Sequence, residues 1–217
     1  MIFNAVFLRV QFWDPFCTFF TLYTGIVEKL NLSYHFYADD SQLYLSFQPT
    51  IPGDRELVVS NIERCVLEID HWMLVNRLKL NKDKTELLVV SAKHLPMPIV
   101  QEIFVVGETI RSSQKARNIG VTFDNQVLFN DYVASICKSS FYHLCNVTYI
   151  RKFLSSSTTE ILVHAFASSK LDHCNSSLYG LPNYQVKTLQ HVQNAAARRI
   201  SLSRKHKHIM PILLHLH

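Results

Sequence analysis

Two adjacent acids, Asp39 and Asp40, are the residues best placed by type and spacing to do chemistry. Hard divalent cations such as magnesium take oxygen ligands, and usually combine one or two carboxylates with substrate phosphates. In two-metal phosphoryl transfer, carboxylates from separate chain segments converge on ions about 3.5–4 Å apart. Because Asp tolerates turn conformations, such a pair is also common in ordinary turns. The pair is therefore either part of a metal site or a plain turn.

The acids lie at the tip of a predicted hairpin. Apolar side chains alternate before and after the pair, which is the pattern of two short strands joined by a turn over residues 38–41; they are Tyr34, Phe36, Leu43, Leu45 and Phe47. Over residues 55–76 the apolar positions change to the spacing of one buried helix face. The sequence predicts a hairpin followed by a helix of about six turns.

The pattern changes from strands to helices near residue 124. The strand patterns before this point cover residues 86–90, 101–106 and 116–123, and a turn over 78–81 precedes the first. The helical patterns after it cover two segments between 133 and 166, and a third over 184–201 with Val186, Leu189, Val192 and Ala196 on one face. Ser157 and Glu160 have the capping-box spacing that would start the second helix. We expect an α+β fold, with an α/β domain over 1–124 and a helical domain over 125–217.

Composition agrees with a globular intracellular protein. The chain has 217 residues and is 48% hydrophobic and 18% charged, so it can bury a core. Its five cysteines include no CxxC pair, which favours reduced thiols over a zinc site or a disulfide framework. Arg9, Asp14 and Pro15 interrupt the apolar N-terminus before the roughly 18 apolar residues of a membrane span. We expect no membrane span and no secretion, and place the protein in the cytoplasm or nucleus.

Positive charge is concentrated at the C-terminal end. The formal net charge is +5, and no acidic residue follows Asp172. The basic residues beyond it are Lys187, Arg198, Arg199, Arg204, Lys205 and Lys207. This end is either a contact for a polyanion or a solvated basic helix face.

The sequence around the acids resembles reverse transcriptases of non-long-terminal-repeat (LINE-type, jockey-like) retrotransposons. Residues 37–47, YADDSQLYLSF, match the catalytic hairpin of that family, and the resemblance extends over roughly residues 19–215 in the family's order. The further matching segments are 71–73 (HWM), 76–81 (NRLKLN), 84–86 (KTE), 117–124 (RNIGVTFD), 171–175 (LDHCN), 180–182 (GLP) and 193–198 (QNAAAR). This resemblance favours the metal-binding interpretation of the acidic pair over the plain turn.

The resemblance implies a partial polymerase palm, an antiparallel sheet with packed helices, followed by a helical thumb bundle. It implies that Asp39 binds catalytic Mg²⁺, with Asp40 as a less direct contributor, and that Tyr37 lies near the primer terminus and incoming deoxynucleotide. Lys84 matches a lysine that helps protonate the pyrophosphate leaving group, or is an exposed turn lysine. Gly120 matches the strand turn that grips the primer, or is an ordinary strand-end glycine.

The thumb of this family lies along the duplex of RNA template and DNA primer. The basic C-terminal helix is then the expected phosphate contact, since each neutralised phosphate releases counterions. The candidate nucleic-acid-binding residues are Arg198, Arg199, Arg204, Lys205 and Lys207. The interleaved His206 and His208 lack a third ligand and are interpreted as surface residues.

The sequence departs from the family where a working polymerase most needs to match it. The family's other essential metal-binding Asp lies on an upstream strand, and this sequence begins after that motif; Asp14 has a different setting. The fingers are also missing, and the Gly-rich motif is degraded. We expect a truncated RNA-directed DNA polymerase domain that is inactive alone. The alternatives are a non-catalytic nucleic-acid-binding remnant and a decayed product that folds poorly or self-associates through the exposed palm face.

Overall fold

The computed structural model describes residues 4–12, 20–37, 40–91, 100–204 and 207–216. The chain forms two compact units, which we call the sheet unit (Met1–Val127) and the helical unit (Leu128–His217). The predicted α+β class is confirmed as a mixed fold with an antiparallel-rich sheet and packed helices. The sequence pattern had placed the change between the two parts at residue 124.

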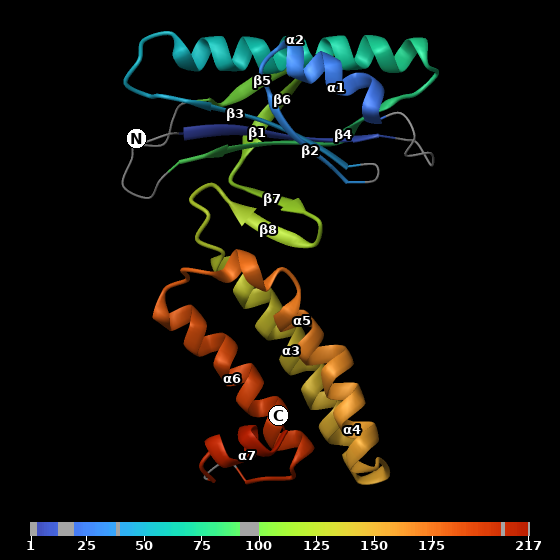
Figure 1. Ribbon diagram of the computed structural model, residues 1–217, viewed down its shortest axis with the longest axis vertical. Coiled ribbons are helices and arrows are strands. Elements are labelled where there is room, and N and C mark those ends of the chain that lie inside the picture. Colours follow the sequence, from blue (N-terminus) through green and yellow to red (C-terminus); the bar gives the residue numbers. More distant parts are fainter. Residues whose placement is uncertain (1–3, 13–19, 38–39, 92–99, 205–206, 217) are drawn as a thin grey trace. The chain divides into compact units, whose positions relative to one another are not determined.

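The sheet unit is built from a split βαβ arrangement. Its first six elements are β1 (Asn4–Phe12), α1 (Phe20–Lys29), β2 (Ser33–Tyr37), β3 (Asp40–Phe47), α2 (Asp54–Val75) and β4 (Leu80–Val90). Their strands lie in the order β2-β3-β1-β4, and each neighbouring pair is antiparallel. Helices α1 and α2 cover one face of this sheet (Figure 1). The order β-α-β-β-α-β with this strand arrangement is a known supersecondary unit.

Strand β1 is the central strand and was not predicted. Its Val6, Leu8 and Val10 are at most 1% exposed and join the core under α2, where they meet Ile62 and Ile69. The alternate residues of β1 point to the other face and are half-buried, as the period of two in a strand requires. The apolar N-terminus is therefore a core strand. Helix α1 was not predicted either.

The hairpin and the helix after it were predicted and are confirmed. Strands β2 and β3 pair through Tyr37 and Asp40, so β3 begins at Asp40, inside the range 38–41 that the sequence predicted as the turn. Helix α2 buries Val58, Ile62, Cys65, Val66, Ile69 and Met73, which repeat at helical spacing.

Strand β4 is continuous from Leu80 to Val90, where the sequence predicted a turn and a shorter strand. Its pairing with β1 is irregular, because Arg9 lies opposite Glu86 while Gln11 lies opposite Asn81. Residues 82–85 therefore bulge out opposite Val10, and the Thr85 hydroxyl donates to the Asn81 carbonyl oxygen over 3.1 Å. The predicted break lies at this irregular bulge.

Two short hairpins complete the sheet unit. Strands β5 (Glu102–Val105) and β6 (Glu108–Ser113) extend the sheet beside β4; β6 was not predicted. Strands β7 (Lys115–Asn118) and β8 (Val121–Asp124) form a separate pair on the face opposite the helices (Figure 1). Residues 116–123 are thus a hairpin and not one strand. Its tip has positive φ at Ile119 (45°) and Gly120 (82°), the two-residue turn that favours glycine.

The helical unit packs its long helices around an apolar core. Its elements are α3 (Asn130–Ile150), a 3₁₀ turn (Arg151–Phe153), α4 (Ser156–Val163), a π-helical turn (His164–Ser168), α5 (Ser169–Asp172), a 3₁₀ turn (Asn175–Leu178), α6 (Asn183–Ile200) and α7 (Met210–Leu216). Val133, Leu144, Val163 and Val192 are each at most 3% exposed. The three long helical segments predicted from the sequence are confirmed. None of the helices in the described part of the chain is long and apolar enough to cross a membrane.

Two local predictions for the helical unit are wrong. Helix α4 is capped by Ser155, whose hydroxyl accepts from the Thr158 amide over 3.0 Å, and not by Ser157. In α6 the buried face contains Gln185, at 2% exposed, while Val186 is 47% exposed. The Gln185 amide nitrogen donates to the Leu128 carbonyl oxygen over 2.9 Å, and this hydrogen bond offsets part of the cost of burying a polar side chain.

Candidate functional site at the Asp40 end of the sheet

The hairpin that carries the acidic pair ends at one edge of the sheet. Tyr37 is the last residue of β2, pairs with Asp40, and is 61% exposed. Asp40 begins β3 and pairs on its other side with Gln11 of β1. Asp39, the acid expected to bind the metal ion, lies outside the described residues. The site can therefore be built only around Asp40.

Arg9 is the partner of Asp40. It lies on β1, on the sheet face away from the helices, and its Nη2 donates to both Asp40 oxygens, over 2.9 and 3.1 Å. Its Nη1 lies 3.5 Å from the Glu86 carboxylate on β4. The side chains of Arg9 and Asp40 are only 18% and 14% exposed. One guanidinium therefore bridges carboxylates from the two strands that flank β1, with Nη2 shared between both oxygens of Asp40 and Nη1 directed to Glu86.

The β7–β8 hairpin closes over this cluster. The Arg117 carbonyl oxygen accepts from Arg9 Nη1 over 2.8 Å, and the Arg117 amide donates to Glu86 over 3.4 Å. The Gln42 amide nitrogen donates to Asn118 Oδ1 over 2.7 Å. Segments that are about 75 to 110 positions apart in sequence thus meet at one end of the sheet.

The other residues predicted for this site are less tightly held. Lys84 lies in the bulge of β4 and is exposed. Gly120 forms the tip of the β7–β8 hairpin, two positions beyond Asn118. The β7–β8 hairpin, which carries Gly120, reaches the Asp40 cluster through Arg117 and Asn118. No contact in the described residues links Lys84 to Asp40.

A row of aromatic rings continues the same face of the sheet. Phe7 on β1 stacks on Tyr44 on β3 with ring centroids 5.6 Å apart, and Tyr44 stacks on His35 on β2 at 5.7 Å. Phe7 and Tyr44 are paired in register, and such cross-strand aromatic pairs stabilise a sheet. Because each ring already stacks on its neighbour, we interpret the row as structural support beside the cluster.

The carboxylates of the described residues do not fit a magnesium site. Mg²⁺ requires carboxylate oxygens at about 2.0–2.1 Å in octahedral geometry, and both oxygens of Asp40 already accept from Arg9. Among the described residues there is also no group of three or more His, Cys, Asp or Glu side chains that could hold a metal ion. A magnesium ion at Asp40 would therefore have to compete with the Arg9 guanidinium.

The basic residues predicted to contact phosphate in the helical unit differ in their exposure and hydrogen bonding. Arg199, Arg204 and Lys207 are exposed. Arg198 is half-buried, and its Nη1 donates to the Lys207 carbonyl oxygen over 3.0 Å, so it ties the end of α6 to the following segment. Lys205 lies outside the described residues. The three exposed cations are the ones that can meet a phosphate directly.

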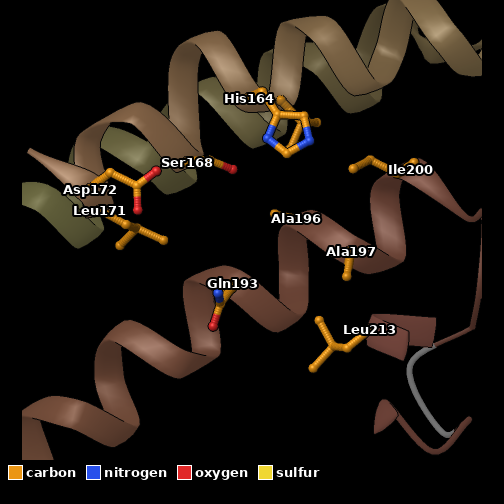
Figure 2. Close-up of a pocket in the computed structure, with 10 residues that line it drawn as sticks. His164, Ser168, Leu171, Asp172, Gln193, Ala196, Ala197, Ile200 and Leu213 are labelled. Atoms are coloured by element: carbon orange, nitrogen blue, oxygen red, sulfur yellow. The ribbon is translucent and has the colours of Figure 1, made fainter. Parts of the chain in front are cut away.

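A separate pocket of about 220 Å³ lies within the helical unit (Figure 2). Ala196, Ala197, Ile200 and Leu213 are among its apolar lining residues. His164, Ser168 and Asp172 follow one another along one side, and Gln193 lies across from them (Figure 2).

The polar rim of this pocket has the residue types of a nucleophilic triad, which requires His to hydrogen-bond both partners. Within the part of the chain that the structure describes, no hydrogen bond joins His164, Ser168 and Asp172. His164 instead lies 4.0 Å from Glu160. The pocket is an apolar depression with a polar rim and lacks the connected geometry of a hydrolase centre.

Sequence reasoning missed the partners of Asp40. Arg9 was noticed only as an interruption of an apolar run, and Glu86 only as the start of a strand and the last residue of the 84–86 segment. The available signal was the alternation of Val6, Leu8 and Val10, which would have placed Arg9 on the opposite face of a strand. The identity of the carboxylate that it contacts depends on strand register, which has no local signal.

Comparison of the chain with models of protein families, with curated proteins and with solved structures found no match in any of the three. The function proposed below therefore rests on the residues and contacts of this chain.

Proposed function

We propose that the chain is the palm-and-thumb part of a reverse transcriptase from a non-long-terminal-repeat retrotransposon, and that it does not polymerise DNA by itself. The reaction of the parent enzyme is attack of a primer 3′-hydroxyl on a deoxynucleotide, directed by an RNA template and two magnesium ions. The implied partners are the RNA template, the DNA primer and deoxynucleotides, and the implied place is the cytoplasm or nucleus.

One observation carries the proposal. By resemblance, two segments contact the primer end: the hairpin with Tyr37 and Asp40, and the turn with Gly120. They are distant in the sequence, yet Gln42 and Asn118 join them by a 2.7 Å hydrogen bond. Proximity of these two motifs is what a primer-binding palm needs, and it could not be read from their spacing along the chain. The antiparallel sheet with helices on one face supports the same conclusion.

The missing activity follows from what lies next to Asp40. Two-metal catalysis needs carboxylates that converge from separate segments, and β1, the strand beside Asp40, contributes the cation Arg9. Loss of positioning of the reacting groups alone removes several kcal/mol of catalysis. Negligible nucleotide incorporation is therefore expected of this chain.

The test is primer extension on a primed RNA template with magnesium. The chain would be compared with a version extended upstream by the carboxylate motif and fingers of this family, and with that longer version carrying Asp39→Ala. We expect incorporation only by the longer version with Asp39 intact. Equal failure of the longer version, shown to be folded and to bind primer, would contradict the proposal.

A second function, non-catalytic binding of nucleic acid, is favoured by the charge of the helical unit. This unit holds ten basic and three acidic residues, a formal net charge of +7. Binding that weakens steeply with salt, with no extension by either version, would select this alternative. Self-association through the sheet face away from the helices remains a prediction, for which the oligomeric state in solution is the measurement.

A further inference from the structure

We infer that Arg9 is the resident cation of the Asp40 end of the sheet. Its guanidinium lies where a divalent ion shared by Asp40 and Glu86 would have to lie, and it also fastens the β7–β8 hairpin to the sheet. The inference rests on the contacts within the sheet unit and does not depend on the proposed function.

The first support is the geometry of the ion pairs. Arg9 Nη2 takes both oxygens of Asp40, over 2.9 and 3.1 Å, and Nη1 reaches Glu86 over 3.5 Å. Asp40 and Glu86 come from strands on opposite sides of β1. Because Arg9 stands between them on the central strand, it is the residue through which two carboxylates from separate segments are held together.

The second support is the burial of the pair. The Asp40 side chain is 14% exposed and that of Arg9 is 18% exposed. A carboxylate so far withdrawn from water needs a partner charge, and Arg9 supplies it through Nη2, which donates to both oxygens. A divalent ion could reach Asp40 only by displacing the Arg9 guanidinium or by binding next to that positive charge. Either alternative weakens metal binding.

The third support is the link to the β7–β8 hairpin. Arg9 Nη1 donates to the Arg117 carbonyl oxygen over 2.8 Å, while Glu86 accepts from the Arg117 amide over 3.4 Å. Arg9 and Glu86 thus satisfy both backbone groups of Arg117. Removing the guanidinium leaves that carbonyl without its donor, so the hairpin is expected to loosen.

The resident cation is tested by measuring Mn²⁺ binding to the full chain. Electron paramagnetic resonance monitors the binding, with no primer or nucleotide present. We expect the unmodified chain to bind Mn²⁺ at least tenfold more weakly than Arg9→Asp, which places a third carboxylate beside Asp40 and Glu86. Adding Asp40→Asn to Arg9→Asp should remove the gain. Arg111→Asp, at an exposed arginine elsewhere in the sheet unit, is the matched control and should not gain Mn²⁺.

Arg9→Met provides a second variant if Arg9→Asp does not fold. It removes the cation and keeps an apolar stem, and we expect it to bind Mn²⁺ more tightly than the unmodified chain. The inference would be overturned by Mn²⁺ binding in the unmodified chain that Asp40→Asn abolishes. It would equally be overturned if neither folded Arg9 variant gained Mn²⁺.

Hydrogen exchange tests the fastening of the hairpin. The amides of residues 115–124 should exchange at least tenfold faster in Arg9→Met than in the unmodified chain, and Arg9→Lys should lie between them because it keeps the charge but loses the fork. Unchanged exchange in Arg9→Met would contradict the fastening role. Since no primer is present, these results are separate from the outcome of primer extension.

Discussion

The two units of this chain differ most clearly in charge. The sheet unit holds twelve basic and fourteen acidic residues, a formal net charge of −2, whereas the helical unit is at +7. In the sheet unit, Asp40 is paired with Arg9. In the helical unit, Arg199, Arg204 and Lys207 stay exposed. Under the proposed function, the motif for catalysis and the charge for polyanion binding belong to different units; Asp40 of the motif is paired with a cation, whereas the exposed cations of the helical unit are open to a polyanion.

Individual aromatic side chains also differ widely in burial. In the sheet unit Phe47 is 2% exposed and belongs to the core, while in the helical unit Tyr149, Phe153 and Tyr179 are 84%, 76% and 96% exposed. Exposed aromatic rings contribute little to the core and are available for contacts with other molecules. Substitutions of the same residue type at a buried and at an exposed position should therefore have very different effects.

The largest expected effect is on stability. Phe47→Ala should lower the free energy of unfolding of the sheet unit by about 3–5 kcal/mol, because it removes a fully buried ring and leaves a cavity. Phe153→Ala, at an exposed phenylalanine, should change stability by less than about 0.5 kcal/mol. Urea unfolding followed by circular dichroism measures both. Similar losses for the two variants would break the comparison.

The next effect is on nucleic-acid binding. Replacing Arg199, Arg204 and Lys207 by Ala should reduce the slope of log Kd against log salt concentration by about two to three. At 0.15 M salt, binding should weaken about a hundredfold. The matched triple variant replaces the exposed Arg64, Lys79 and Arg111 of the sheet unit and should leave binding nearly unchanged. Fluorescence anisotropy with a primed RNA template measures both, and a larger loss in the sheet-unit variant would reverse the assignment.

A smaller effect is expected at the start of α4. Ser155→Ala should destabilise the helical unit by about 1 kcal/mol, because the hydroxyl that accepts from the Thr158 amide is lost. Ser157→Ala lies inside the helix and should cost less than about 0.5 kcal/mol. Thermal unfolding of the two variants distinguishes them. A greater loss at Ser157 would restore the capping box predicted from the sequence.

The smallest effect concerns pH and the cysteines. Burial raises the pKa of the Cys65 thiol to about 12, above its unfolded value of about 8.5. A raised folded pKa adds stability below pH 8.5 that is lost as pH rises towards 12, and at pH 9 the loss should be under about 1 kcal/mol.

Cys145 of the helical unit is exposed. A thiol reagent at pH 8 should label Cys145 first and Cys65 only on unfolding, as mass spectrometry can show; early labelling of Cys65 would contradict its burial.

The elements with strong local patterns were predictable from the sequence. The hairpin around Asp40, helix α2 and the three long helical segments each repeat apolar residues at their own period. Strand β1 was missed because Phe7, on its outer face, is apolar like Val6 and Leu8 and so obscures the alternation of Val6, Leu8 and Val10. In α6, Gln185 is buried and Val186 is exposed, because the buried Gln185 amide is stabilised by a hydrogen bond to the Leu128 carbonyl oxygen.

The candidate site was predictable only in part. Local sequence identified Tyr37, Asp40 and Gly120 because each belongs to a recognisable segment. The contacts that decide the chemistry join Arg9 to Asp40, Glu86 and Arg117, and these depend on strand order, register and the bulge of β4. No local pattern encodes such long-range pairing, and a one-residue slip would turn Arg9 to the other face.

The most direct test of the central claim is incorporation of a single deoxynucleotide by this chain on a primed RNA template. Protein would be in excess over primer, with magnesium present and Asp39→Ala as the paired variant, and anisotropy would confirm that the primer is bound. We predict bound primer and no product from either protein. Product formed by the unmodified chain and lost in Asp39→Ala would contradict the account, because a working metal site would then exist beside Arg9.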